Sequence, residues 1–262
     1  MSKRYSVVVS ILSVVVLAGT SGAALAAECP PAPVASCELT GPQSPRDIEN
    51  TSGRNKVKFS KAPPVADMRL CDIHFHKLAE HKIPATEPAP GGQEGYVCRA
   101  MPPSSPREPV KAEPHHNGCG GILLGDTIEV HWVFTTCNVE PAPCLTSCFS
   151  AACINPELRV ETQVFYLTTP PNGEDWARAG YPSLPPGAGP GTVEYLGSTT
   201  GDAYDGAKCS PFQATWKVRP DCRRLTLESL NKWCDDNPFD EDHAHGVRNL
   251  VSNPELLSRI EP

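Results

Sequence analysis

Short runs of apolar residues, separated by proline-rich stretches, form the main pattern along this chain. Four runs are crowded with branched and aromatic side chains, which favour β-strands. Two further segments, 226–233 and 254–259, have the composition of short helices, and Thr226 and Pro238 bracket the first of them. The four predicted strands are residues 68–76, 127–135, 160–168 and 212–219.

The 29 prolines lie mostly between these predicted strands. Proline removes a backbone donor and clashes with the preceding helical turn, so long helices do not cross such stretches. No internal repeat is visible. The sequence therefore predicts one mainly β domain with long proline-rich loops and few short helices. Within it, we expect the segment 84–114 to be mobile.

The N-terminus has the pattern of a secretory signal peptide. Lys3 and Arg4 precede an apolar run over residues 7–17, and Ala24-Leu25-Ala26 is a small-residue cleavage signature. The run is short for a membrane span of about 20 residues, and no later run is long enough. We expect residues 1–27 to be a signal peptide and residues 28–262 to be the exported domain, periplasmic or secreted.

All 12 cysteines lie after this signal. An even number of cysteines in an exported chain predicts several disulfides rather than free thiols. Cys144, Cys148 and Cys153 lack the C-x-x-C spacing of a zinc knuckle, so we interpret them as a stapled loop. The 23 basic and 30 acidic residues give a net charge of −7 without a basic block, which argues against a nucleic-acid partner.

Two predicted strands carry histidines with the spacing of a metal site. His74 and His76 are two residues apart, so in an extended strand both side chains point to the same face. His131 lies in the middle of the second predicted strand. Three imidazoles can hold zinc and leave a fourth position for water, whose pKa then falls towards about 7. The same residues also fit ordinary surface or hydrogen-bonded histidines.

A second metal site is compatible with the same segment. Residues 74–80 fit the His-x-His-x3-Glu spacing of cupins, in which Glu80 and a later histidine would complete an iron or manganese site. On these residues alone, a zinc site and a cupin-like oxygenase both remain open.

The wider sequence resembles carbonic anhydrases. Six short elements are similar to α-class motifs and occur in the same order. These are Gln43-Ser44-Pro45-Arg46-Asp47-Ile48, the zinc strand 68–76, Ala79-Glu80-His81, the strand 128–133 around His131, the Gly-Ser-Thr-Thr element 195–200, and the Thr-Trp strand 212–218. The compact His-Phe-His-Lys-Leu-Ala-Glu-His form, the many cysteines and the Val-Arg-x-Leu-Val ending resemble the δ-class more closely.

This resemblance implies a single domain with a central, largely antiparallel sheet and several disulfides. It implies reversible hydration of carbon dioxide to bicarbonate and a proton, by attack of zinc-bound hydroxide. His74, His76 and His131 would hold the zinc, for which cobalt or cadmium could substitute. The enzyme would be a lyase with a small-molecule substrate. A silent binding module with the same fold is the other alternative, although all three histidines are present.

The resemblance also assigns roles around the metal. Thr199 would accept a hydrogen bond from the hydroxide and pass its own proton towards Glu80, while its backbone N–H would hold a bicarbonate oxygen. Thr200 would line the site. Because the leucine of the family's Gly-Ser-Leu-Thr-Thr is missing and Gly201 replaces a proline, the choice between Thr199 and Thr200 stays open.

Further residues would support the metal ligands. Asp72 and Glu129 would accept the free ring N–H groups of zinc histidines and fix their tautomers. Val133 would form part of an apolar wall for carbon dioxide. The resemblance implies a Cys37–Cys209 disulfide, worth about 2–5 kcal/mol.

No proton shuttle is assigned. The chain lacks a histidine between residues 48 and 71, where α-class enzymes often place one. His115 and His116 of the long loop are candidates for this role. We expect His243 and His245, in an acidic stretch, to be exposed bystanders.

Overall fold

The computed structural model describes residues 34–58, 60–99, 118–151, 153, 155–179, 190–201, 203–248 and 250–261. The predicted signal peptide lies outside the described residues, so its boundary at residue 27 stays a prediction. His115, His116 and residues 100–114 of the segment expected to be mobile also lie outside them.

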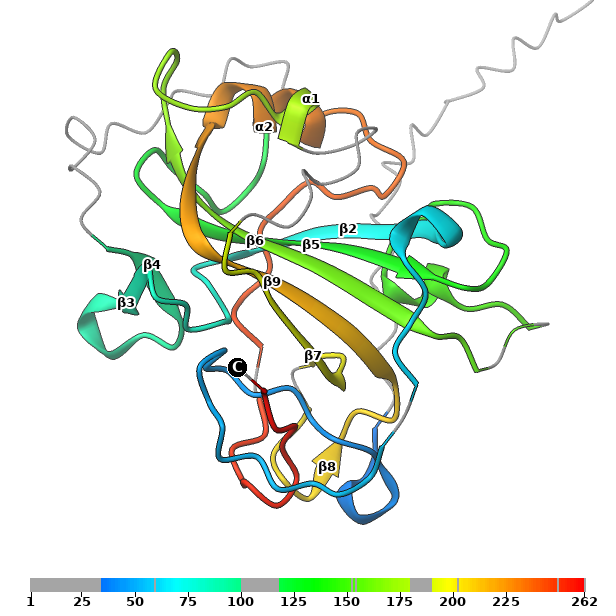
Figure 1. Ribbon diagram of the computed structural model, residues 1–262. Helices are drawn as coiled ribbons and strands as arrows, with labels where there is room; N and C mark the ends of the chain where they lie inside the picture. The colour runs from blue at the N-terminus through cyan, green and yellow to red at the C-terminus, as the bar shows by residue number, and fades with distance from the viewer. Residues whose placement is uncertain are drawn as a thin grey trace, which may run out of the picture.

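A five-stranded mixed sheet forms the centre of the molecule (Figure 1). Its strand order is β2-β5-β6-β9-β7, and only the β6–β9 pair is parallel. This confirms the single, mainly β domain with a largely antiparallel sheet. All four strands predicted from the sequence are present, and β7 was missed. The bounds are β2 Arg69–Lys77, β5 Thr127–Thr135, β6 Leu158–Thr168, β9 Gln213–Thr226 and β7 Val193–Ser198.

Small elements surround this sheet. Two short antiparallel pairs join β1 (Ala35–Ser36) to β8 (Lys208–Cys209) and β3 (Thr86–Pro88) to β4 (Tyr96–Cys98). Among the described residues, the α-helices are α1 (Trp176–Ala179) and α2 (Leu227–Cys234), and Thr226 is the N-cap of α2. The single-turn 3₁₀ helices are η1 Cys37–Leu39, η2 Val65–Asp67, η3 Pro90–Gly92 and η4 Leu145–Cys148.

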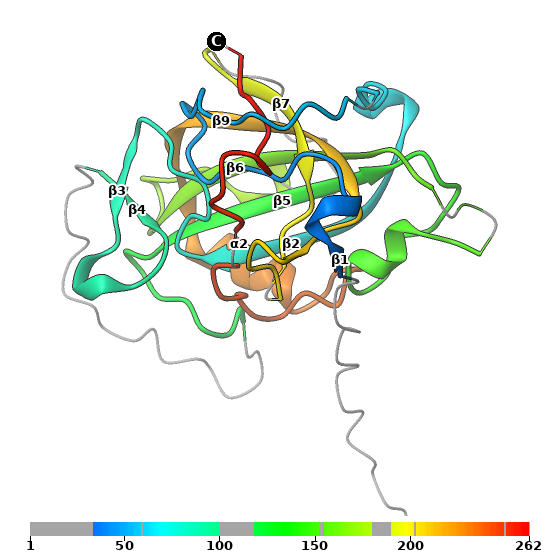
Figure 2. The same cartoon turned by 90° about the horizontal axis from the view of Figure 1, so that it is seen from below.

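The helix predicted over 254–259 was wrong. The segment forms a turn, in which Leu256 N–H bonds the carbonyl of Asn253. Its other backbone groups pair with the N-terminal part of the chain instead, because Gln43 N–H bonds Leu256 O at 2.8 Å and Ser258 N–H bonds Gln43 O at 2.9 Å. Figure 2 shows these two segments, blue and red, running together past the sheet.

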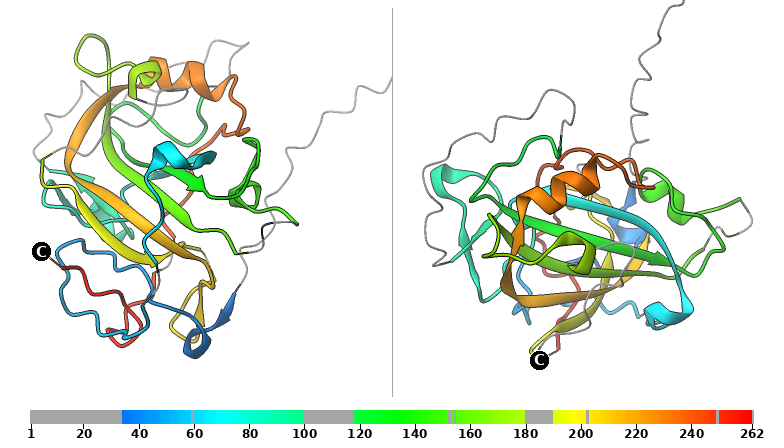
Figure 3. Two further views of the ribbon diagram at one scale, coloured as in Figure 1. Left: turned by 45° about the vertical axis from the view of Figure 1, so that its right-hand side comes forward. Right: turned by 90° about the horizontal axis from the view of Figure 1, so that it is seen from above.

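Both faces of the sheet are covered, and every residue of β5 is buried. On one face, Ile128, Val130 and Trp132 of β5 pack in a core with Trp176 and Trp233 from the two helices. Figure 3 shows α2 lying over the sheet on this side. The alternate residues of β5 turn to the opposite face, where the histidines lie.

Five disulfides tie the described loops to the sheet and to one another. The Cys37–Cys209 pair implied by the resemblance is confirmed. Cys144, Cys148 and Cys153 are all disulfide-bonded, as expected of a stapled loop. The other bridges are Cys71–Cys148, Cys98–Cys222, Cys119–Cys234 and Cys137–Cys153. Such bridges are consistent with an extracellular protein.

Among the described residues, no helix is long and apolar enough to cross a membrane.

Candidate metal centre

The register between β2 and β5 brings the three predicted metal ligands together. His74 lies directly opposite His131 in the antiparallel pair, and His76 lies opposite Glu129. Side chains two apart share a face, so all three imidazoles converge while Phe75 turns into the opposite core. The centroids of the His74 and His131 rings are 5.0 Å apart, as are those of His76 and His131.

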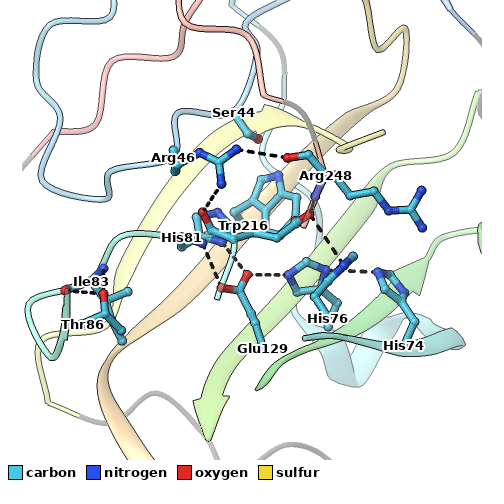
Figure 4. Close-up of polar contacts among 12 residues, drawn as sticks. Ser44, Arg46, His74, His76, His81, Ile83, Thr86, Glu129, Trp216 and Arg248 are labelled. Carbon is cyan, nitrogen blue, oxygen red and sulfur yellow. Dashed lines mark hydrogen bonds and ion pairs between the residues drawn. The ribbon is translucent and has the colours of Figure 1, made fainter. Parts of the chain in front are cut away.

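Each of these imidazoles is held by one acceptor outside the cluster. Figure 4 shows His74 and His76 side by side, with Glu129 nearby. His74 Nδ1 donates to Asp72 Oδ2 at 2.6 Å, and His131 Nε2 donates to Glu129 Oε1 at 2.7 Å. His76 Nδ1 donates to the backbone carbonyl of Gly246 at 2.9 Å. These bonds fix the tautomers, so each ring turns its other nitrogen inward without a proton.

The inward nitrogens fit a metal ion. His74 Nε2 and His131 Nδ1 lie 3.1 Å apart, and with the outer protons in place both are lone pairs facing each other. His76 Nε2 is buried and has no hydrogen-bond partner. One ligand atom from each residue lies within 4.8 Å of the others. Three neutral nitrogen donors suit a divalent cation such as Zn²⁺, which would remove the repulsion between the lone pairs.

The electrostatics favour neutral rings at two of the three positions. Burial lowers the pKa of His76 well below its ordinary value and lowers the pKa of His131 to about 4. Burial also lowers the pKa of His74, but the Asp72 carboxylate more than offsets this and the net pKa shift is upward. The His74 side chain is also the most accessible of the three, at 18 % exposed.

Glu129 lies at the start of a buried chain of hydrogen bonds. Its Oε1 also accepts from His81 Nδ1 at 2.6 Å, and its Oε2 accepts from the His81 backbone N–H at 2.9 Å. Tyr195 O–H then donates to His81 Nε2 at 2.8 Å. Burial raises the pKa of Glu129, but the adjacent histidines outweigh it and hold the pKa well below its ordinary value. His81 and Tyr195 therefore anchor the carboxylate that orients His131.

Glu80 lies behind His76 rather than among the inward nitrogens. Its Oε1 accepts from the Arg248 backbone N–H at 2.6 Å and is 3.7 Å from the outer nitrogen of His76. The other oxygen, Oε2, is buried without a partner among the described residues. Burial first, and the Glu129 carboxylate second, raise the pKa of Glu80 to about 7. Glu80 belongs neither to the cluster of His74, His76 and His131 nor to the neighbouring group of His81, Glu129 and His131, so the cupin-like ligand set is wrong.

Thr199 does not make the contact with Glu80 that the sequence predicted. Its Oγ1 pairs with Ser210 Oγ at 2.6 Å rather than with Glu80, and its backbone N–H bonds Phe212 O at 3.0 Å. The physical reason is that Thr199 directly follows the last residue of β7 and continues its pairing towards β9. Its hydroxyl therefore turns to the segment between β8 and β9, and its N–H is not available to a bicarbonate oxygen. Thr200 is the next hydroxyl along and is half-buried.

The Gln-Ser pair at 43–44 holds this turn in place. Gln43 Oε1 accepts from both Ser198 Oγ and the Ser210 backbone N–H at 3.0 Å. Ser44 Oγ donates to Ser198 O at 2.7 Å. The Cys37–Cys209 bridge closes the same region. The motif near the N-terminus therefore holds the loop that carries Thr199 and Thr200.

His245 is not a bystander. Its ring centroid lies 5.8 Å from that of His74 and 5.9 Å from that of His76, and its Nε2 is 3.1 Å from Glu241 Oε2. His245 is beside the cluster because its backbone pairs with β2 opposite His76. His243 is exposed, as expected, and pairs with Asp242.

A family model described as Delta carbonic anhydrase matches residues 65–229, more than half of the chain. The chain belongs to this family. The match contains His74, His76 and His131 together with Glu80, Thr199 and Thr200. No curated protein matches the chain closely enough to count as a relative.

Asp72 and Glu129 lie where the sequence predicted them, as hydrogen-bond acceptors of His74 and His131. Val133 is buried on the same face of β5, and its part in a carbon dioxide wall stays a prediction. Sequence reasoning missed the roles of His81 and Tyr195, although both lie within motifs that carried the resemblance. It also missed Gly246, which contributes a backbone oxygen and so leaves no side-chain signal.

Proposed function

We propose that this carbonic anhydrase hydrates carbon dioxide reversibly to bicarbonate and a proton, using one Zn²⁺ held by His74, His76 and His131. The observation that supports this most is the orientation of the three rings. Each donates one N–H to an outer acceptor and turns a bare nitrogen towards the other two. We also propose that the mature chain, residues 28–262, is exported to a periplasm or secreted.

Zn²⁺ held by three neutral nitrogens would acidify a bound water towards a pKa of about 7, and cobalt or cadmium could replace it. The protein's contribution is to hold the three rings in fixed orientations and to keep two of them neutral. Burial lowers the pKa of His76 and His131, so neither ring competes for protons at neutral pH. Asp72 and Glu129 make their ligands more basic and hold the ring planes in place.

We assign the orienting hydroxyl to Thr200 in preference to Thr199. The Thr199 hydroxyl is engaged with Ser210, whereas Glu80 Oε2 is a buried acceptor with no described partner. A Thr200 hydroxyl that donates to Glu80 Oε2 presents its own oxygen as an acceptor. That arrangement would fix the direction from which the reacting oxygen approaches carbon dioxide. Glu80 in turn is held by the Arg248 backbone N–H.

The test combines metal content with carbon dioxide hydration, followed by stopped-flow with a pH indicator. We expect about one zinc per chain in the oxidised wild-type protein and hydration that depends on it. His131→Ala should lose most of the metal and the activity. His243→Ala is the matched control, because His243 is 63 % exposed and is not one of the three converging histidines, and it should behave as wild type. Zinc and hydration retained in His131→Ala would refute the assignment.

A further inference from the structure

The Arg46 guanidinium connects two segments that meet behind the metal centre. Arg46 Nη1 donates to the backbone carbonyl of Glu80 at 3.1 Å, and Nη2 donates to the backbone carbonyl of Arg248 at 3.1 Å. Figure 4 shows the Arg46 side chain directed between these groups. Glu80 and Arg248 are far apart in sequence, so a single planar side chain bridges the end of β2 and the C-terminal segment.

These three residues form a closed ring of contacts. In addition to the two bonds from Arg46, the Arg248 N–H donates to Glu80 Oε1 at 2.6 Å. The Arg46 backbone is itself fixed, since its carbonyl accepts from Lys82 N–H at 2.8 Å. A guanidinium presents donors in a rigid plane, which allows it to hold two carbonyls at once in a defined geometry.

The C-terminal segment in this ring also supplies a contact to the metal ligands. Gly246 O accepts from His76 Nδ1, and this bond fixes the tautomer of His76. On one side of Gly246, the His245 backbone pairs with β2 through bonds of 2.9 Å to Phe75 and 2.8 Å to Lys77. On the other side of Gly246, Arg46 and Glu80 hold the backbone of Arg248. The position of the Gly246 carbonyl therefore depends on the contacts of His245 and on those of Arg248.

We propose that Arg46 is a positioning residue for the metal centre, which acts through Arg248 and Gly246 on the orientation of His76. Arg46 occupies the variable position of the Gln-Ser-Pro-x-Asp-Ile element, so the motif alone does not assign it this role. The proposal rests on the proposed function only for its effect on hydration. Its effects on metal affinity and on the His76 ring are independent of the reaction.

The test compares Arg46→Met and Arg46→Lys with Arg54→Met in the full oxidised protein. Methionine keeps an unbranched apolar stem without donors, whereas lysine keeps the charge but offers a point donor in place of the planar fork. Arg54 is the matched control, because its side chain is 64 % exposed and pairs with Glu255 at the surface. Zinc affinity is measured by chelator competition, and the ring N–H protons of the zinc-loaded protein are followed by NMR.

We expect zinc to bind about tenfold more weakly to Arg46→Met, the lower end of the effect of removing an outer contact of a metal ligand. The His76 Nδ1 proton should exchange faster with water, while the His131 Nε2 proton, held by Glu129, should not change. Arg46→Lys should show a smaller change in the same direction, and it replaces Arg46→Met if that variant does not fold. Arg54→Met should match wild type.

Two results would overturn the proposal. One is unchanged zinc affinity with an unchanged His76 proton in Arg46→Met. The other is an equal acceleration of all the ring protons, which indicates general loosening of the fold. If wild type binds zinc without hydrating carbon dioxide, the proposed function fails while these readouts still decide the role of Arg46.

Discussion

Replacing Glu129 by glutamine tests whether the buried carboxylate orients the metal centre. Three donors converge on Glu129: the His81 backbone N–H, His81 Nδ1 and His131 Nε2. Glutamine has the same shape but accepts at only one end. If its oxygen takes the place of Oε1, its NH₂ group faces the His81 backbone N–H; if it is flipped, the NH₂ group faces both rings. In either orientation at least one buried donor loses its acceptor.

The magnitude follows from these contacts. A buried donor left without a partner costs about 1–3 kcal/mol, so metal-free Glu129→Gln should be less stable by this amount in urea unfolding. Loss of an outer partner weakens a metal site by about 10–100-fold, which corresponds to about 1.4–2.7 kcal/mol of binding free energy. Both effects have the same origin, because His131 no longer has a charged acceptor at Nε2.

The assay is chelator competition for zinc, together with urea unfolding of the metal-free protein. Glu161→Gln is the matched control: Glu161 lies on the neighbouring strand β6, 3.9 Å from Lys217 and away from the cluster. Its zinc affinity should stay within twofold of wild type. A Glu129→Gln variant with wild-type zinc affinity would show that the hydrogen bond to His131 does not support the metal.

Two further predictions concern the hydroxyl and the pH dependence. Thr200→Val should lower the hydration rate constant kcat by about 100-fold, the cost of losing one oriented polar group, whereas Thr199→Val should mainly reduce stability. If stopped-flow assays show the larger loss of kcat in Thr199→Val, the assignment is contradicted. Because Asp72 raises the pKa of His74, protons compete with zinc there first, and zinc affinity should begin to fall at a higher pH than it would with a histidine of ordinary pKa. Asp72→Asn should weaken zinc binding at neutral pH and move this onset to lower pH, and an onset that does not move would refute that role for Asp72.

The sequence predicted the strands of the site well because two local signals coincide in them. Alternation places His74 and His76 on one face, and the branched residues around His131 favour a buried strand. The pairing of His74 opposite His131 was not predictable, since register is a property of two strands together. Local pattern also gave no sign of Gly246, which joins the site only when the C-terminal segment lies along β2.

The failures have physical causes of the same kind. The segment 254–259 has helical composition, but its backbone groups bond to Gln43 and pairing with another segment overrides the local preference. The contact expected between Thr199 and Glu80 is absent because Thr199 continues the pairing of β7 towards β9, where its hydroxyl meets Ser210. His245 was expected to be exposed on account of its acidic neighbours, yet its pairing with β2 places it beside His74.

The most direct test of a zinc-dependent hydration site is to remove the metal by chelation and return it in steps while measuring carbon dioxide hydration. The proposed function predicts negligible hydration without metal. The rate should then rise in proportion to added zinc and level off at about one zinc per chain. A rate that does not depend on zinc, or a fully loaded protein with no hydration, would contradict it.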